Sequence, residues 1–137
     1  MASRLNPYLT FDGNAREAME FYRSVFGGQL QISTFGEYGS PGPDSADKVM
    51  HAMLTTDRGY VLMASDTPPG MPYHKPGDAI TCSLSGDPGE GLEEVWEHLS
   101  DGGTVTMPFE KQMWGDLYGM CVDRFGIPWM VNVAQPQ

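Results

Sequence analysis

His51 is the residue of this sequence best placed for acid–base chemistry. It lies in the middle of the apolar segment KVMHAML, residues 48–54, which is typical of a β-strand. A histidine in a sheet is most often a structural residue held by a hydrogen bond. The alternative is that His51 faces a cavity, where it would act as a base or orient a ligand. The alternation along the strand would then place Val49 and Met53 on the same face.

The other two histidines lie in different kinds of segment. His74 falls in a stretch rich in proline and glycine, and His98 lies near the end of a predicted helix. A metal site of the usual kind needs several nitrogen, sulfur or carboxylate ligands that converge. Three histidines spread over a strand, a linker and a helix end do not predict such a site.

Two aromatic residues, Trp114 and Tyr118, lie close together in MWGDLYGM. They would either pack at the rim of the core or form an aromatic wall with a polar edge in a pocket, and both interpretations stay open. Methionine is also frequent, with ten in the chain. Thioether side chains adapt to irregular shapes, so they suit a core or an apolar pocket. Six of them fall in predicted strands and the loops beside them: Met53, Met63, Met107, Met113, Met120 and Met130.

Common catalytic signatures are missing from the sequence. It has no G-x-S-x-G motif and no G-x-G-x-x-G loop of the kind that binds nucleotide-like cofactors. Its two cysteines, Cys82 and Cys121, lie in apolar strand-like segments without Cys-x-x-Cys spacing, which predicts buried, reduced thiols.

Composition and charge predict a folded globule of one domain that avoids nucleic acid. The 137 residues are 40% hydrophobic, and 18 acidic against 8 basic side chains give a net charge of −10. This charge would repel phosphate backbones and anionic membrane surfaces. No apolar run has the length of a signal peptide or a membrane span, so we expect a cytoplasmic protein.

The chain contains the same helical pattern twice. In GNAREAMEFYRSVFGG, residues 13–28, an apolar stripe of Ala18, Phe21, Tyr22 and Val25 precedes a glycine pair. In DPGEGLEEVWEHLSDGG, residues 87–103, Leu92, Val95, Trp96 and Leu99 form the matching stripe. We expect Asn14 with Glu17 to cap the first helix, and Asp87 to cap the second with Pro88 at its first position.

Predicted strands surround both helices in the same order. Residues 6–11 and 80–85 precede the helices and alternate apolar with smaller or polar side chains. Three further strands follow each helix, at 30–35, 48–54 and 60–65 and then at 104–109, 118–122 and 128–133. The predicted unit is therefore β-α-β-β-β, written twice.

The predicted fold class is α+β, with two β-α-β-β-β modules that curl into a half-barrel around a cavity. A helix covers only one face of each sheet, so the two remaining faces would enclose the cavity. We expect a single domain over residues 1–137, with repeat one at about 4–66, a linker at about 67–78 and repeat two at about 79–134.

These segments together resemble a known family. NPYLTFDGNAREAMEFYRSVFGG, VMHAML, VLMASD, TVTMPFEKQMWGDLYGM and DRFGIPWMVN, in this order, are similar to the vicinal oxygen chelate superfamily of glyoxalase, bleomycin-resistance and dioxygenase proteins. The nearest branch is the PhnB-like one, the 3-demethylubiquinone-9 3-methyltransferase-like domain. The resemblance implies this fold and a homodimer.

The resemblance also implies where metal ligands would lie. The leading strands match at Asn6 and Thr81, and the closing strands match at about Met63 and Met130. Divalent metals in such enzymes need imidazole and carboxylate at these places, and amide, hydroxyl and thioether are poor substitutes. A bound divalent metal is therefore disfavoured, and no cofactor is predicted.

The sequence predicts a protein that binds a small, partly apolar organic molecule at a degenerate metal site. Its alternative function is that of a metal-dependent enzyme of the glyoxalase or dioxygenase type, with a site remodelled around His51. The expected ligand contacts are Asn6, Tyr8, His51, Met63, Thr81, Trp114, Tyr118 and Met130, with His51 as the catalytic candidate.

Overall fold

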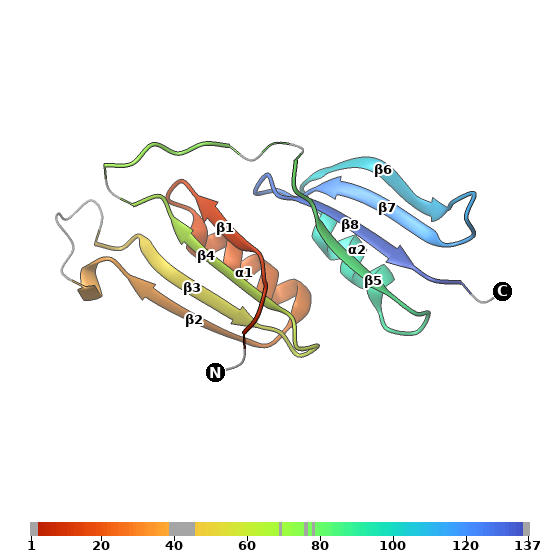
Figure 1. Ribbon diagram of the computed structural model, residues 1–137, viewed down its shortest axis with the longest axis horizontal. Coiled ribbons are helices and arrows are strands. Elements are labelled where there is room, and N and C mark those ends of the chain that lie inside the picture. The colour runs from red at the N-terminus through yellow and green to blue at the C-terminus, as the bar shows by residue number, and fades with distance from the viewer. Residues whose placement is uncertain (1–2, 39–45, 69, 76, 78, 136–137) are drawn as a thin grey trace. The chain divides into compact units, whose positions relative to one another are not determined.

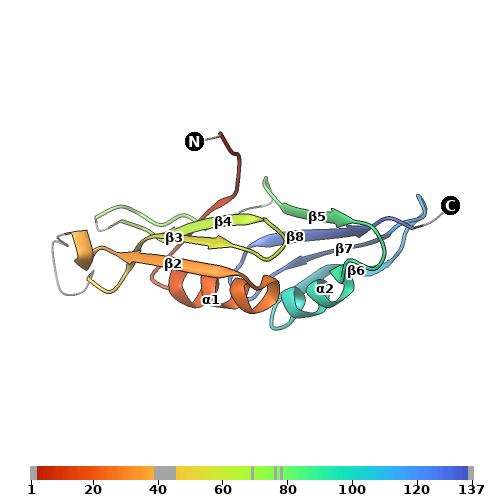
Figure 2. The same cartoon turned by 90° about the horizontal axis from the view of Figure 1, so that it is seen from below.

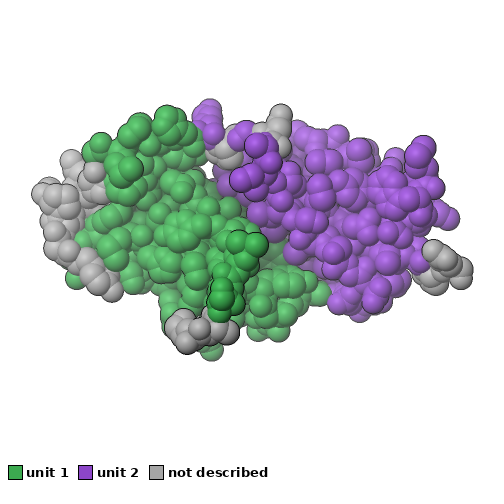
Figure 3. All heavy atoms as spheres, viewed as in Figure 1, with its two compact units in different colours: residues 1–74 green, residues 75–137 purple. Residues whose placement is uncertain are grey.

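The computed structural model describes residues 3–38, 46–68, 70–75, 77 and 79–135. The chain divides into two compact units, residues 1–74 and residues 75–137, which Figure 3 shows in different colours. Each unit holds one four-stranded mixed sheet and one α-helix, so the fold class is α+β, as predicted. No helix in the described part of the chain is long and apolar enough to cross a membrane.

Unit 1 begins with β1 (Tyr8–Phe11) and α1 (Ala15–Phe26). β2 (Gln29–Thr34), the short 3₁₀ turn η1 (Gly36–Tyr38), β3 (Val49–Thr55) and β4 (Val61–Asp66) follow. The sheet order is β1-β4-β3-β2 (Figure 1). β1 runs parallel to β4, while β3 is antiparallel to both of its neighbours.

Unit 2 repeats this arrangement. β5 (Cys82–Gly86) and α2 (Leu92–Ser100) are followed by β6 (Thr104–Lys111), β7 (Leu117–Val122) and β8 (Pro128–Val133). The sheet order is β5-β8-β7-β6, with β5 parallel to β8. The predicted order β-α-β-β-β is therefore confirmed in both units, and every predicted strand is present within two residues of its expected ends.

In each unit the helix covers one face of the sheet, and the other face carries no described helix (Figure 2). Residues that point toward the helix are buried, such as Leu54 and Ala64 in unit 1 and Val131 in unit 2. Their neighbours along each strand point away and stay half-buried or exposed. We call the helix-free side of each sheet its open face. Period-two alternation therefore decides which side chains are available for ligands.

The apolar stripes of the helices match the sequence prediction fully only in α2, where all four predicted residues are buried. In α1 the buried residues include Ala18 and Tyr22, but also Met19 and Phe26, while the predicted Phe21 and Val25 are only half-buried. The buried face of α1 is therefore displaced from the predicted apolar stripe toward Met19 and Phe26. The helix packs on three strands, β3, β2 and β4, so its buried face is broad.

Both predicted helix caps are wrong. The side chain of Asn14 makes no capping hydrogen bond, and the buried carboxylate of Asp66 replaces it by accepting from the backbone N–H groups of Gly13 and Ala15, both at 2.9 Å. Helix α2 begins at Leu92 after Gly91, so Pro88 lies before it, and Glu90 accepts a hydrogen bond from the Asp87 N–H. A side chain distant in sequence can satisfy helix N–H groups as well as a local cap can.

The glycine pairs after both helices were predicted correctly. Gly28 and Gly103 each pack against a neighbouring strand, where a Cβ atom would overlap the carbonyl oxygen of Thr55 or of Val122. Gly28 also has φ +103°, a left-handed conformation that favours glycine. These two residues bring the chain from the helix end into contact with the turn that joins the third and fourth strands of the unit.

Candidate functional site

On the open face of unit 1, one row of residues crosses all four strands. The strand register aligns Tyr8 of β1 with Met63 of β4, Met63 with Met53 of β3, and Met53 with Gln31 of β2. Directly opposed residues in a sheet point to the same side. The row therefore places two thioethers between an aromatic ring and an amide.

His51 also lies on this open face, and a β-bulge determines that position. The register pairs Ser33 with His51 and then Thr34 with Val49, so Met50 is the extra residue. As a result Val49 is buried on the helix side and donates its N–H to the Asp66 carboxylate at 2.9 Å. The expected pairing of His51 with Met53 on one face agrees with this register, but the expected placement of Val49 on that face is wrong.

The His51 ring is held by Tyr8, which reaches over β4 from β1. The Tyr8 hydroxyl lies 3.1 Å from His51 Nδ1, and the two rings stack with centroids 5.7 Å apart. Both side chains remain partly open to solvent. His51 is therefore a hydrogen-bonded residue, as one alternative from the sequence expected, and it lies on the open face; its role as a base or ligand contact stays a prediction. The hydrogen bond orients the imidazole ring and leaves Nε2 available to a partner.

A cavity of about 450 Å³ opens beside this row. Gln29 and Gln31 of β2, Met53 and Thr55 of β3, and the turn residue Asp57 contribute to its lining, together with Gly28 and Thr56. Gln29 pairs with Thr55 and Gln31 with Met53, so these four side chains lie on the open face. The lining offers two amides, a hydroxyl, a carboxylate and one thioether.

Asn6 precedes β1 and is half-buried. Its amide Nδ2 donates only locally, to the carbonyl oxygen of Pro7 at 3.0 Å. The Pro7 carbonyl in turn accepts from Met63 N–H at 3.2 Å, so the chain at Asn6 is fixed to β4. Asn6 is thus close in the fold to the Tyr8–Met63 row, two residues before Tyr8 along the chain.

The open face of unit 2 carries a row that is richer in sulfur. Ser83 of β5 aligns with Met130 of β8, Met130 with Met120 of β7, and Met120 with Met107 of the edge strand β6. Thr81 lies just before β5 and is half-buried. Three adjacent thioethers make this face more apolar than the open face of unit 1.

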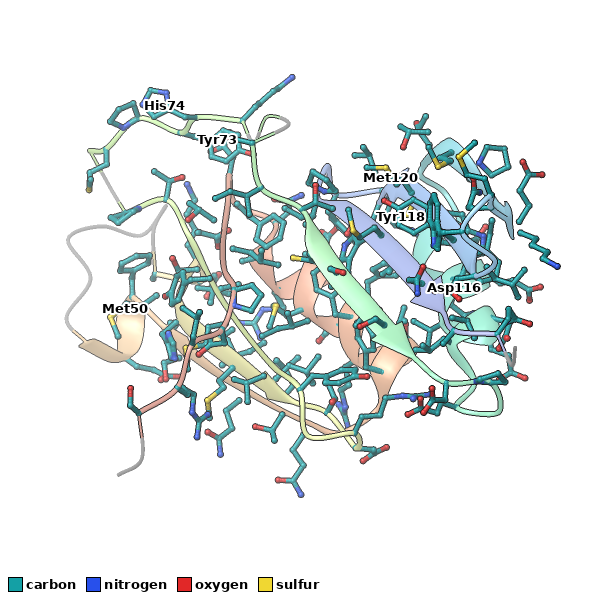
Figure 4. All side chains as sticks on the ribbon, turned by 45° about the vertical axis from the view of Figure 1, so that its right-hand side comes forward. Met50, Tyr73, His74, Asp116, Tyr118 and Met120 are labelled. Carbon is teal, nitrogen blue, oxygen red and sulfur yellow. The ribbon has the colours of Figure 1, made fainter. Side chains whose placement is uncertain are left out.

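Tyr118 and Trp114 form the aromatic part of this open face. The Tyr118 hydroxyl donates to the Met130 sulfur at 3.6 Å, and its ring meets the Trp114 ring edge-on at a centroid distance of 5.4 Å. Figure 4 shows Tyr118 and Met120 on the same strand, with Asp116 just before it. Trp114 is 56% exposed, which leaves one side of its ring free to contact a ligand.

Asp116 is a structural residue of this hairpin. Its carboxylate accepts from Asn132 Nδ2 at 3.0 Å and from the Gln135 N–H at 3.2 Å, and its carbonyl accepts from the Gln112 N–H. These contacts tie the β6–β7 turn to the end of β8. They fix the backbone from which Trp114 and Tyr118 project.

The candidate residues of the two units occupy equivalent places. The turn at Thr56–Tyr60 and the turn at Asp123–Ile127 have matching backbone hydrogen bonds. The strands on both sides of the two turns can therefore be aligned residue by residue. On this alignment His51 corresponds to Tyr118 and Met63 to Met130, while Asn6 and Thr81 precede corresponding strands. Six of the eight predicted site residues thus form three corresponding pairs, whereas Tyr8 corresponds to Ser83 and Trp114 lies in the turn before β7.

The residues that the family resemblance implies for the four chelating positions do not fit a divalent metal. Asn6 and Met63 in unit 1, and Thr81 and Met130 in unit 2, offer amide, thioether and hydroxyl in place of imidazole and carboxylate. In the part of the chain that the structure describes, no three His, Cys, Asp or Glu side chains come together as a metal site. The donor set therefore gives no chelating cage of the usual kind.

The cysteines are poor nucleophiles in this fold. Both are free thiols, Cys121 buried and Cys82 half-buried. Burial, followed by the negative charge of Asp123, raises the pKa of each thiol from 9.0 to about 11. Because only the thiolate attacks, neither is suited to nucleophilic catalysis at neutral pH.

Sequence reasoning missed part of both open faces. Gln31, Ser83 and Asp57 were not among the predicted contacts, Met107 and Met120 were recognised only as members of a methionine-rich group, and Met53 was also placed on the face of His51. The missed residues all lie on the same rows as predicted ones or beside the cavity. Aligning the two repeats strand by strand would have found Met53 and Met120, because they flank Met63 and Met130.

The sequence profile of the 3-demethylubiquinone-9 3-methyltransferase family matches residues 3–132. The chain belongs to this family. Among solved structures, protein PA1353 from Pseudomonas aeruginosa is 39% identical, with 98% of this chain and 100% of that chain covered and a TM-score of 0.83. A PhnB protein from Bacillus cereus is 27% identical, with 96% and 100% covered and a TM-score of 0.75.

The family shares its fold with the vicinal oxygen chelate superfamily. A glyoxylase/bleomycin resistance protein/dioxygenase domain from Frankia is 14% identical, with 98% of this chain and 93% of that chain covered and a TM-score of 0.62. At this identity the likeness concerns the fold alone. The resemblance inferred from the sequence motifs is thereby confirmed for the PhnB-like branch, and for the wider superfamily the likeness is one of fold.

Proposed function

We propose that this family member binds a small, partly apolar organic molecule on the open faces of its sheets, without a bound transition metal. The observation that carries the proposal is the row of Tyr8, Met63 and Met53 with the Tyr8–His51 hydrogen bond beside it, on a face that no described helix covers. Ligand sites usually combine a lining of apolar side chains, which can adapt to the shape of the ligand, with a few polar groups that orient it.

Tyr8 and His51 are suited to recognise a polar group of the ligand. When the Tyr8 hydroxyl donates to Nδ1, His51 Nε2 carries the proton and can donate to a carbonyl or hydroxyl oxygen. Asn6 lies two residues before Tyr8 and adds a side-chain amide. Met63 and Met53 then supply the apolar surface beneath.

In unit 2, Tyr118 and Trp114 offer ring surfaces to an apolar or aromatic part of a ligand. Met130 and Met120 form the floor beside them, and Thr81 adds a hydroxyl just before β5. The activity named in the family's description is not part of the proposal, because the sequence lacks the G-x-G-x-x-G loop that would bind a nucleotide-like methyl donor.

The alternative is a metal-dependent enzyme of the glyoxalase or dioxygenase type that recruits His51. The observation in its favour is that a histidine whose Nδ1 is hydrogen-bonded presents its Nε2 in the manner of a metal ligand or a base. The two functions differ in whether the purified protein carries stoichiometric zinc, nickel, manganese or iron. Elemental analysis of the wild type and of His51→Ala, purified without chelator, separates them.

A thermal-shift screen with quinones, aromatic acids and peptide antibiotics tests the binding proposal. A ligand that binds only the folded state raises the unfolding temperature by mass action. We expect at least one compound to do so, and we expect its affinity to fall about 5- to 20-fold in Tyr8→Phe through the loss of one hydrogen bond. The matched control is Tyr60→Phe, because the Tyr60 ring packs on Phe26 of helix α1.

Two results would overturn the proposal. One is a stoichiometric metal in the wild type that His51→Ala loses, which would favour the enzyme. The other is a screen in which no compound stabilises the protein, since a ligand-binding protein responds to a ligand in excess of its Kd.

A further inference from the structure

The C-terminal ends of the two helices lie next to side chains of opposite charge, although their C-cap residues differ, Gly27 in α1 and Asp101 in α2. Each helix is followed by a glycine with positive φ, Gly27 at +73° and Gly102 at +78°, and each glycine lies against the turn between the third and fourth strands of its unit. In unit 2 the turn residue beside the glycine is Arg124, and in unit 1 it is Asp57. The matching backbone hydrogen bonds of the two turns make these residues equivalent.

Arg124 occupies the C-terminal end of helix α2 as a cation. Its guanidinium donates to the carbonyl oxygen of Asp101 from Nε at 3.1 Å and from Nη2 at 2.9 Å, and it also contacts the Asp101 carboxylate at 3.2 Å. The C-terminal end of a helix carries partial negative charge, so a cation is favourable there. Unit 2 thus supplies this charge from its own chain.

Unit 1 presents a carboxylate at the corresponding place. The Asp57 carboxylate lies against Gly27, where a Cβ atom would overlap it. A negative side chain at the negative end of a helix is unfavourable unless a cation joins it. Arg23 lies in the last turn of α1 and Arg58 directly follows Asp57, but neither of them lines the cavity that adjoins Asp57.

The cavity provides the room that a ligand's cation would need. It holds about 450 Å³ and adjoins Asp57, Gly28, Gln29 and Gln31. The amide oxygens of the two glutamines and the hydroxyl of Thr55 can accept hydrogen bonds from an ammonium or guanidinium group. Met53, which lies both in the cavity lining and in the Tyr8 row, connects this polar end to the open face.

We propose that the cavity beside Asp57 binds the protonated amine or guanidinium group of an organic cation, which takes the place that Arg124 fills in unit 2. This inference rests on the proposed function and deepens it by naming the polar group of the ligand. The net charge of −10 favours the approach of such a cation. A charge-assisted hydrogen bond to a carboxylate is stronger than a neutral one, so Asp57 is the residue that decides specificity.

The test compares charged and neutral probes on the same protein by ¹H–¹⁵N NMR titration. The cationic probes are phenethylammonium and agmatine, and the neutral counterpart of the first is 2-phenylethanol, each added to about 10 mM so that binding in the millimolar range is detected. We expect the cations to shift the amide signals of Gly28, Gln29 and Thr56. The neutral alcohol should shift these signals at least about tenfold less at equal concentration.

Substitutions at Asp57 decide whether its charge is responsible. Asp57→Asn should weaken binding of the cationic probes about tenfold or more, while Asp87→Asn, which removes one exposed charge from unit 2, should leave it unchanged. Asp57→Arg should abolish binding and raise the unfolding temperature, because the arginine would repeat the arrangement of Arg124 at the end of helix α1.

The outcomes separate this inference from the proposed function. If the alcohol shifts the signals of Tyr8 and His51 and the cations show no preference for Asp57, the cation site is wrong and the binding function stands. If Asp57→Asn binds the cations as well as the wild type does, the cation site is also wrong. If no probe shifts any signal of the open face, both are wrong.

Discussion

At the scale of the residue, the same position carries different chemistry in the two units. His51 and Tyr118 are equivalent, yet His51 is hydrogen-bonded by Tyr8 and Tyr118 donates to the Met130 sulfur. The leading strands account for the difference, because unit 1 has Tyr8 where unit 2 has Ser83, which is too short to reach across a strand. One open face therefore presents an oriented imidazole, and the other presents a phenol over thioethers.

The buried carboxylate of Asp123 is a residue on which the stability of unit 2 depends. It accepts from the N–H groups of Phe125 at 2.8 Å and Ile127 at 3.1 Å and from Trp129 Nε1 at 2.8 Å. Asp123→Asn replaces an acceptor with a donor and should lower the free energy of unfolding by about 2–4 kcal/mol, measured by urea denaturation. The exposed Asp101→Asn is the control and should cost under about 1 kcal/mol. Equal losses in the two variants would contradict this account.

The thiols predict a loss of stability at alkaline pH. Burial, and then the charge of Asp123, raises the pKa of Cys82 and Cys121 from 9.0 to about 11 in the folded protein. Between these values the unfolded chain has lost protons that the folded chain still holds, so stability falls as the pH rises from 9 toward 11. The unfolding temperature of the wild type should drop more steeply over this interval than that of a Cys82→Ala/Cys121→Ala variant. Parallel curves would show that other groups are responsible.

At the scale of the element, glycines and a bulge position the candidate site. The bulge at Met50 moves Val49 to the helix side while His51 remains on the open face. Gly28 and Gly103 let each helix end approach its neighbouring turn, which brings Asp57 and Arg124 to corresponding places. Local backbone geometry thus decides which side chains line the cavity.

Gly28 and Gly59 of unit 1 both have positive φ, but only Gly28 is closely packed, so substitutions at the two positions distinguish the stability cost of a close contact from that of the backbone conformation. Gly28→Ala would place Cβ on the Thr55 carbonyl at φ +103°, and we expect a loss of more than about 3 kcal/mol or failure to fold. Gly59→Ala has a similar φ of +87° but nothing within 4 Å, so it should cost only about 1 kcal/mol. Chemical denaturation of both variants measures the difference. A small loss in Gly28→Ala would mean that β3 can move away from the helix end.

At the scale of the whole molecule, the chain is two compact units built on one design. Each unit has its own sheet and helix, and they correspond strand by strand. Edge strand β6 of unit 2 differs from β2, because Val105 and Met107 are exposed along it, and Met113 and Trp114 are exposed in the turn that follows. A long exposed strand with apolar side chains is a surface that natural proteins usually cover.

We expect the chain to form a homodimer, as the family resemblance implies. Sedimentation equilibrium should give twice the mass of one chain at micromolar concentrations. Replacing the two most exposed apolar side chains of the β6–β7 turn, in Met113→Ser/Trp114→Ser, tests whether this turn takes part, and should shift the equilibrium toward the monomer. A wild-type protein that stays monomeric at the highest soluble concentration would contradict the expectation.

The sequence by itself determined the repeated β-α-β-β-β order, the glycines that end the helices and the family. These depend on local features, namely periodicity, turn residues and motif order, which can be read without knowledge of distant contacts. It also proposed His51 and Tyr118 from their strand segments, and Met63 and Met130 from the family resemblance, and all four lie on the open faces.

Only the tertiary structure decided how these residues are used. The capping of helix α1 by Asp66, the contact of Tyr8 with His51 across β4, and the opposite charges of Asp57 and Arg124 each join residues distant in sequence. Such pairs depend on strand register, and a shift of a single residue would move each side chain to the other face. For that reason the cavity beside Asp57 could not be predicted from the sequence and is defined only by the folded chain.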